Sequence, residues 1–231
     1  MFNLRGGWST RGSIGRDFVR FDPDDDSAYD VLTPEGPAPF AVPDELSGLL
    51  GAGLALTTPT FKRFNASVDT RGNSVAIFAE ASEGRESRIS GSLAVRPTES
   101  IRLDGSATYS RITRAGDGSE FARTVVPRIK VEYQPTRALF FRAVAEYRSQ
   151  RQAALVDPTT GQPLMRYGLV ADAVHVDGLR VDFLVSFEPR PGTVAFFGYG
   201  SALETGRVLS LEDLTRQSDG FFVKLAYLFR R

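Results

Sequence analysis

The feature that most constrains the fold of this 231-residue chain is a strict alternation of apolar and polar side chains along several long segments. In residues 101–110, Ile101, Leu103, Gly105, Ala107 and Tyr109 alternate with Arg102, Asp104, Ser106, Thr108 and Ser110. Side chains of a β-strand point alternately to its two faces, so this segment predicts a strand with one apolar and one polar face. The same period returns in 128–133, 139–148, 179–188 and 221–229.

Proline turns divide the chain into similar units. Pro59, Pro97, Pro135 and Pro189 each lie in a short turn, and they are separated by 38, 38 and 54 residues. A unit of 38 residues holds two strands of roughly 10 to 14 residues, one tight turn and one longer loop. That unit is typical of an antiparallel up-and-down sheet.

We expect ten strands in the chain. They are placed at residues 2–21, 49–58, 61–80, 86–96, 100–112, 121–134, 138–153, 165–188, 192–203 and 216–230. Within 61–80 the apolar positions change from even to odd numbers across Arg71-Gly72-Asn73, which predicts a bulge, with an extra hairpin as the alternative. The connections 157–163 and 204–215 are long, as is the segment 22–48, which we expect to be a long extracellular loop, whereas the proline turns are short and periplasmic.

The length of these strands favours a membrane protein. Strands of soluble sheets average five to six residues, whereas a tilted strand needs about 9 to 11 residues to cross the hydrocarbon of a bilayer. Tyr109, Tyr133, Tyr147 and Phe187 lie near strand ends, where aromatic rings meet lipid headgroups. We therefore predict one all-β domain over 1–231, an antiparallel up-and-down transmembrane β-barrel in the cell outer membrane. Its ten strands either close alone or belong to a larger barrel, and a soluble protein with long strands is the alternative.

Composition removes several other classes. The chain has 28 basic and 28 acidic residues, so no net charge attracts nucleic acid. It has no cysteine, which excludes thiol catalysis and thiolate metal sites. No run of about 18 apolar residues predicts a transmembrane helix. The residues from Met1 to Arg5 do not begin a signal peptide, so we expect either a misplaced start or a missing N-terminal region of the same protein.

The last strand carries an assembly signal. Its apolar face holds Phe221, Val223, Leu225, Tyr227 and Phe229. This pattern resembles the C-terminal strand of bacterial outer-membrane barrels, which is read by the barrel-assembly machinery. The pattern usually ends on the aromatic residue itself, whereas here Arg230 and Arg231 follow it. The expected partners are therefore the lipid bilayer and that machinery.

Three stretches near the C-terminus point to a particular family. They are Leu179–Thr193, Phe196–Gly200 and Asp219–Leu225. They are similar to the end of the bacterial family called domain of unknown function 5916, well over about the last sixty residues and only in pattern before them. The resemblance implies a secreted N-terminal domain like the family-9 carbohydrate-binding modules, followed by a large barrel. It implies an architecture, a location and a link to carbohydrate, but no activity.

The polar positions of the strands are the candidate lumen of the barrel. The charged members of this face are Arg102, Asp104, Arg128, Lys130, Glu132, Arg142, Glu146, Arg148, Arg180, Asp182 and Lys224. A ring of one sign would indicate ion selectivity. Because these rows mix both signs, we expect cross-strand ion pairs that brace the wall.

Other candidate chemistry is weak. His175 has Asp172 and Asp177 nearby, and only Asp177 shares its face in a regular strand. The acidic run from Asp22 to Asp26 with Asp30 offers oxygen ligands for calcium, but it lacks the glycine and the closing glutamate of a standard calcium loop. Gly6-Gly7 and Gly116-Asp117-Gly118 are turn or strand glycines and not phosphate loops, because no helix follows them.

The sequence therefore predicts no catalytic residue, no metal site and no cofactor. The leading hypothesis is a passive or partner-coupled barrel for transport or structure, to which the resemblance adds a link to carbohydrate binding or uptake. Two alternatives remain open. One is a membrane anchor that displays a missing N-terminal binding or hydrolytic domain, and the other is an enzyme at the barrel rim that uses His175.

Overall fold

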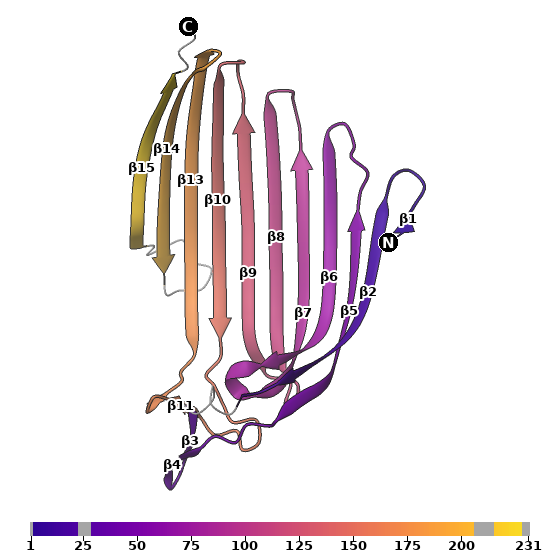
Figure 1. The fold of residues 1–231 in the computed structure, drawn as a ribbon, viewed down its shortest axis with the longest axis vertical. Helices are drawn as coiled ribbons and strands as arrows, with labels where there is room; N and C mark the ends of the chain where they lie inside the picture. The colour runs from indigo at the N-terminus through magenta and orange to yellow at the C-terminus, as the bar shows by residue number, and fades with distance from the viewer. Residues whose placement is uncertain (1, 23–28, 206–214, 228–231) are drawn as a thin grey trace.

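The computed structural model describes residues 2–22, 29–205 and 215–227. Within these residues, eleven strands form one large sheet and four short strands form a second sheet (Figure 1). The large sheet contains β1 (Phe2–Asn3), β2 (Ser9–Arg20), β5 (Glu45–Thr57), β6 (Phe64–Ile77), β7 (Ser82–Val95), β8 (Ile101–Arg114), β9 (Glu120–Tyr133), β10 (Leu139–Gln152), β13 (Val174–Arg190), β14 (Thr193–Thr205) and β15 (Thr215–Tyr227). The small sheet contains β3 (Tyr29–Thr33), β4 (Gly36–Pro39), β11 (Leu164–Arg166) and β12 (Leu169–Val170), and a 3₁₀ turn, η1, covers Phe78–Glu80.

The large sheet is antiparallel throughout, and its strands follow one another in the order β1-β2-β5-β6-β7-β8-β9-β10-β13-β14-β15. This confirms the prediction of an all-β, up-and-down arrangement. Short turns lie at one end of the sheet, called the turn end below, and the small sheet lies at the other, called the loop end (Figure 1). Among the described strands the sheet is open, since β1 and β15 each pair with one neighbour. The described residues include no helix with the length and hydropathy needed to cross a membrane.

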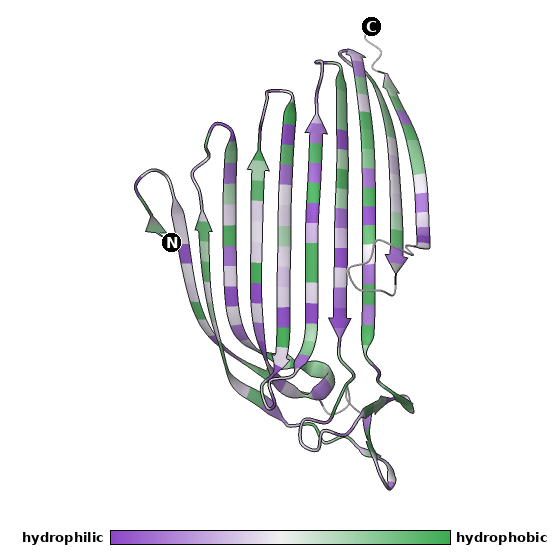
Figure 2. Cartoon of the chain, turned by 180° about the vertical axis from the view of Figure 1, so that it is seen from behind, coloured by the Kyte–Doolittle hydropathy of each residue, from purple (hydrophilic) through white to green (hydrophobic). Residues whose placement is uncertain are grey.

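Alternation along each strand gives the large sheet two chemically different faces, visible as alternating bands in Figure 2. Leu103 of β8 is directly opposed to Val95 and Val131 on its two neighbours, and these three define the apolar face. Asp104 is opposed to Ala94 and Lys130, which belong to the polar face. The register keeps both faces continuous from strand to strand.

The strands are staggered. Starting at Ser9 of β2, the directly opposed residues of the polar face are Thr57, Ser67, Ser92, Ser106, Arg128, Glu146, Arg180, Ala202 and Ser218. Ser9 begins β2 at the turn end, whereas Ser218 lies nine residues from the turn end of β15. The offset is nine residues at about 3.3 Å each, and it accumulates over nine inter-strand spacings of about 4.8 Å. The strands are therefore tilted by about 35° from the direction perpendicular to the line that joins their turn ends. The turns in Figure 1 rise accordingly from β2 to β13.

The N-terminal segment differs from the prediction. The expected strand 2–21 is divided by a turn over residues 4–8, where Gly6 and Gly7 have φ values of 84° and 82°. These left-handed conformations suit glycine, so the chain reverses and β1 pairs with β2. The segment 22–48 is also more structured than a loop, because β3, β4 and the start of β5 lie in it.

The predicted bulge at Arg71-Gly72-Asn73 is wrong. Pairing between β6 and β7 runs without a register shift from Phe64 to Ile77. The change of apolar positions arises because the polar face itself becomes apolar near the loop end, where Ile77 is buried. A register shift does occur between β2 and β5, beside Gly48, whose φ is 77°.

The other strand bounds move by a few residues, with two larger differences. The expected strand 165–188 begins only at Val174, because 164–166 and 169–170 pair in the small sheet. Pro189 lies inside the end of β13 rather than in a turn, at a register shift between Phe187 and Arg190. A proline donates no ladder hydrogen bond, which explains the irregular pairing there.

A small apolar core fixes the loop end. Val31, Leu155 and Leu164 are buried together, and Phe121 of β9 packs against them. Val31 and Leu164 are also paired in the small sheet although they are far apart in the sequence. The small sheet is thereby attached to the loop end of β9.

Candidate functional site

The most extensive candidate surface is the apolar face of the large sheet. On β8 it runs from Ile101 to Tyr109 before the first charged residue, Arg111. On β9 the corresponding run goes from Tyr133 to Val125. Nine residues, at about 3.3 Å each and tilted by about 35°, give an apolar band about 24 Å tall.

This apolar band is exposed rather than packed. Near its middle, Leu93 and Ile129 expose 48% and 59% of their surface, and both lie beside Gly105 in the register. On β15, which has only one neighbouring strand, Leu225 exposes 77%. Monomeric soluble proteins rarely expose a continuous apolar area of this extent, so the face needs an apolar environment.

Aromatic residues border the band at both ends. Tyr133 and Phe187 lie at the turn end, and the rings of Tyr133 and Phe141 stack at 6.2 Å. Tyr109 and Tyr147 lie closer to the loop end on the same face. The four aromatic residues singled out from the sequence therefore share the apolar face.

The polar face brings the predicted charged residues together. Register places all eleven on it: Arg102, Asp104, Arg128, Lys130, Glu132, Arg142, Glu146, Arg148, Arg180, Asp182 and Lys224. That this face lines a lumen remains a prediction. What the geometry shows is a continuous polar surface, across β8, β9, β10, β13 and β15, on the side opposite the apolar band.

Four of these residues form a network on β8 and β9. The Lys130 ammonium lies 2.9 Å from Asp104 and 3.0 Å from Glu132. The Arg102 Nε lies 3.1 Å from Asp104 and 4.0 Å from Glu132. Each cation thus contacts both carboxylates, and the network joins two strands in the way expected of bracing pairs.

The remaining charges pair less completely. Arg128 lies 3.8 Å from Glu146, Arg180 lies 3.3 Å from Asp182, and Arg148 donates a hydrogen bond to Gln150. Within the described residues, Arg142 and Lys224 have no acidic side chain at ion-pair distance. These two residues line one hollow of the polar face together with Arg180. This part of the polar face is therefore locally cationic.

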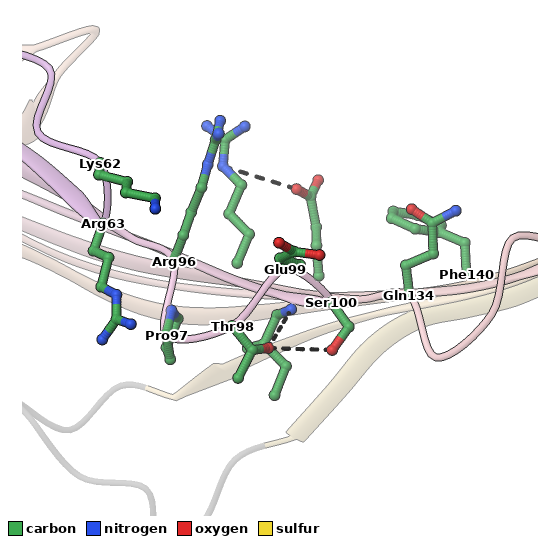
Figure 3. A pocket seen from close by; sticks show the side chains of 12 residues that line it. Lys62, Arg63, Arg96, Pro97, Thr98, Glu99, Ser100, Gln134 and Phe140 are labelled. Carbon is green, nitrogen blue, oxygen red and sulfur yellow. Dashed lines mark hydrogen bonds and ion pairs between the residues drawn. The ribbon is translucent and has the colours of Figure 1, made fainter.

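A polar pocket lies at the turn end, where three turns meet (Figure 3). Lys62, Arg63 and Arg96 surround it from two turns, and Glu99 and Gln134 contribute polar groups. Thr98 Oγ1 and Ser100 Oγ are hydrogen-bonded across 3.1 Å, which holds the 96–100 turn. The pocket opens where the polar face meets the turns, so it belongs to one mouth of that surface.

His175 does contact Asp177, as strand geometry predicts. Nε2 of His175 lies 3.2 Å from Oδ2 of Asp177, which is completely buried. Asp177 is opposed across the ladder by Ser149, whereas His175 is opposed by Arg151. The register therefore opposes the serine to the carboxylate and not to the imidazole, whereas in a relay that activates a nucleophile the imidazole lies between the two.

Two further predictions fall wholly or partly on residues that the structure does not describe. Most of the acidic run proposed for calcium lies in 23–28, outside the described residues, and in the described part no three acidic or histidine side chains are arranged to hold a metal. In β15, Phe221, Val223, Leu225 and Tyr227 all lie on the exposed apolar face. Phe229, the last member of that set, lies outside the described residues.

Sequence reasoning missed two clusters. One is a buried pair at the loop end, Glu80 and Arg114. The other is a row of cations on the apolar face, described below. No local pattern marks either, because their members come from different strands and meet only through the register.

Comparison with protein-family models, with curated proteins and with solved structures found no match.

Proposed function

We propose that this chain forms the wall of a transmembrane β-barrel in the cell outer membrane, with its apolar face against lipid and its polar face toward an aqueous interior. The observation that carries this proposal is the exposed apolar band, about 24 Å tall and bordered by aromatic residues. Outer-membrane barrels have an apolar band of about 25 Å between two aromatic girdles.

Energetics support a lipid environment for this face. Apolar surface left in water costs about 25 cal/mol per Å² relative to burial. Several strands of the band expose large apolar side chains, among them Ile89, Leu93 and Ile129. Lipid removes this cost for all of them at once, without a protein partner for the face.

The strand tilt also supports the proposal. Barrels are formed from strands tilted typically by 35–45°, and the stagger of this sheet corresponds to about 35°. A membrane requires every backbone polar group to be paired, so the edges formed by β1–β2 and by β15 must themselves be joined. They pair either with each other or with further strands.

The orientation follows from the connections. Short turns face the periplasm in known outer-membrane barrels, and long loops face outward. The small sheet, with its core at Val31 and Leu164, would then lie on the outer surface beside the barrel rim. The last strand, β15, presents its apolar side chains to lipid and supplies the segment that assembly machinery would read.

We propose passive or partner-coupled passage of hydrophilic solutes as the role of the polar face. Its charges have both signs, and most of them are paired across or along strands. Such a wall is braced and hydrated but carries no ring of one sign. The hollow that contains Arg142 and Lys224 gives it a local preference for anions.

The first experiment refolds the purified chain into detergent and compares unheated with boiled samples on a denaturing gel. A fast band that disappears on boiling, with a β-rich circular dichroism spectrum, is expected if the strands close. A monomeric β-protein that needs no detergent would contradict the membrane proposal. Aggregate bound to detergent would mean that the sheet requires additional strands.

Conductance in planar bilayers separates transport from anchoring. Discrete conductance steps from the refolded chain are expected if the polar face lines a channel. A heat-sensitive barrel without conductance would favour a membrane anchor that displays another domain.

A further inference from the structure

One register row on the apolar face brings together three arginines and the single histidine of the chain. Arg111 of β8 is directly opposed to Arg123 of β9, Arg123 to Arg151 of β10, and Arg151 to His175 of β13. These four residues, three of which are arginines that stay charged, are called the cationic row below. It lies two residues beyond Tyr109 toward the loop end, at the edge of the apolar band.

Acidic partners compensate this row only in part. Glu120 lies 2.8 Å from Arg111 Nε and 2.6 Å from Arg123 Nη2, so one carboxylate serves two guanidinium groups. His175 has Asp177 as its partner. Arg151 has no acidic side chain at ion-pair distance within the described residues. The Nε of Arg123 is buried, and no described residue accepts a hydrogen bond from it.

The nearest other charges do not change this balance. Arg85 and Glu83 of β7 follow further toward the loop end on the same face, one of each sign. Like charges that are directly opposed in a sheet destabilise the pairing. Glu120 supplies one negative charge to Arg111 and Arg123 together, so the three consecutive guanidinium groups keep an excess of positive charge for which the described residues place no further carboxylate at ion-pair distance.

We propose that the cationic row binds the phosphate group of an anionic lipid in the leaflet at the loop end. The inference rests on the proposed function, because it needs the apolar band to be in a bilayer. A lipid whose acyl chains lie along the band beside Tyr109 has its headgroup at the height of the row. The apolar band would thus contact the acyl chains of the lipid, and the cationic row would contact its phosphate group.

The chemistry of the row fits a phosphate. Directly opposed side chains of a sheet are about 4.5–5.5 Å apart at Cβ, so two neighbouring guanidinium groups reach the oxygens of one phosphate. Arginine offers paired donors in a planar fork that matches phosphate oxygens, and it stays charged at every working pH. Arg151 is the centre of the site, because it is opposed by Arg123 on one side and His175 on the other.

The experiment measures lipid binding by the refolded full chain. The chain in detergent is titrated with bisphosphorylated lipid A, with the same lipid after enzymatic removal of phosphate, and with inorganic phosphate. Retained lipid is then measured by native mass spectrometry. Variants Arg151→Gln and Arg123→Gln test the row. Arg88→Gln is the matched control, because Arg88 lies on the polar face opposite Ser110, the residue before Arg111.

Binding of the phosphorylated lipid is expected to exceed that of the dephosphorylated lipid. Each row variant should weaken it by about fivefold, the change expected for one basic residue near an anionic surface, and Arg88→Gln should leave it unchanged. Equal binding of both lipids would overturn the proposal. So would equal loss in Arg88→Gln, or competition by inorganic phosphate at the same concentration as lipid.

A separate measurement distinguishes failure of the lipid-binding proposal from failure of the proposed membrane function. The same samples are floated with phosphatidylcholine vesicles, which carry no net charge. Insertion into these vesicles without a preference for phosphorylated lipid would reject the cationic row alone. A chain that does not insert at all would reject the membrane wall and the row together.

Discussion

The carboxylate of Glu80 accepts two hydrogen bonds from the guanidinium group of Arg114, at 2.7 Å from Nε and 2.6 Å from Nη2. Glu80 is fully buried, and the side chain of Arg114 is 12% exposed. The pair also binds the 153–157 connection, because Glu80 accepts a hydrogen bond from the Val156 amide and Arg114 donates one to the Ala154 carbonyl. One ion pair therefore links η1, β8 and the chain that leads to the small sheet.

Glu80→Ala is expected to destabilise the protein by about 3–5 kcal/mol, because it leaves the Arg114 charge buried without its partner. Urea unfolding followed by the fluorescence of Trp8, the single tryptophan, measures the loss. The double variant Glu80→Leu with Arg114→Met removes both charges and should be much closer to the parent protein. Equal losses in the single and double variants would show that packing, and not the ion pair, dominates.

Leu93→Arg is expected to impair insertion into vesicles. Leu93 lies at the middle of the apolar band, where an arginine against lipid costs about 2–4 kcal/mol. Ser92→Arg changes the adjacent residue on the polar face, where only the hydrogen bond to Ser67 is lost, at about 1 kcal/mol. Folding yield in phosphatidylcholine vesicles, read from heat-sensitive mobility on a gel, should fall for Leu93→Arg alone. A fall for Ser92→Arg alone would mean that the face assigned here as polar is the one that contacts lipid.

Arg142→Glu combined with Lys224→Glu should shift ion selectivity toward cations, because both side chains line the cationic hollow of the polar face. The measurement is the reversal potential of single channels in a salt gradient. Arg85→Glu makes the same type of change on the apolar face and should leave the potential where it was. An unchanged potential in the double variant would mean that ions do not pass this surface.

Gly48→Ala is expected to cost about 1–2 kcal/mol. Its φ of 77° disfavours a side chain, and an added Cβ would lie 3.4 Å from the guanidinium of Arg16. Gly72→Ala is the control, because Gly72 has ordinary strand geometry and open space around its Cβ position, so it should be neutral or stabilising by up to about 1 kcal/mol. Urea midpoints of the two variants give the comparison.

The 115–119 turn should respond to acid. Asp117 accepts hydrogen bonds from the backbone N–H and the hydroxyl of Ser119, and these hold the pKa of its carboxyl below the ordinary value. A lowered pKa stabilises the folded turn above the unfolded pKa, and that contribution is lost as the pH falls through the folded value. Carbon NMR of the carboxyl should show a low midpoint, which Ser119→Ala raises. The same midpoint in the parent protein and in Ser119→Ala would show that the Ser119 hydroxyl does not lower the pKa of Asp117.

Much of the large sheet follows from the sequence because the relevant signal is local. Alternation with period two identifies both the strand and its two faces, and the turns at Pro59, Pro97 and Pro135 mark where the chain reverses. The eleven charged residues of the polar face could be assigned to one surface for this reason alone. Their partners could not be assigned, because contact between Lys130 and Asp104 depends on the register of two strands.

The small sheet shows the opposite situation. β3 and β11 are separated by most of the large sheet in sequence, and neither is long enough to show a period. Their pairing depends on a core that forms only when the loop end is assembled around Leu164. The extra strand β1 was likewise hidden, because the positive φ angles of Gly6 and Gly7 are a property of the folded turn.

By itself the sequence determined that this chain is an antiparallel meander of long strands with one apolar and one polar face. Those properties depend on residues two apart along one strand. Only the tertiary structure decided the stagger of the strands, the burial of Glu80 against Arg114, and the alignment of Arg111, Arg123 and Arg151. Each of these depends on register and loop closure between separate strands, which no local pattern encodes.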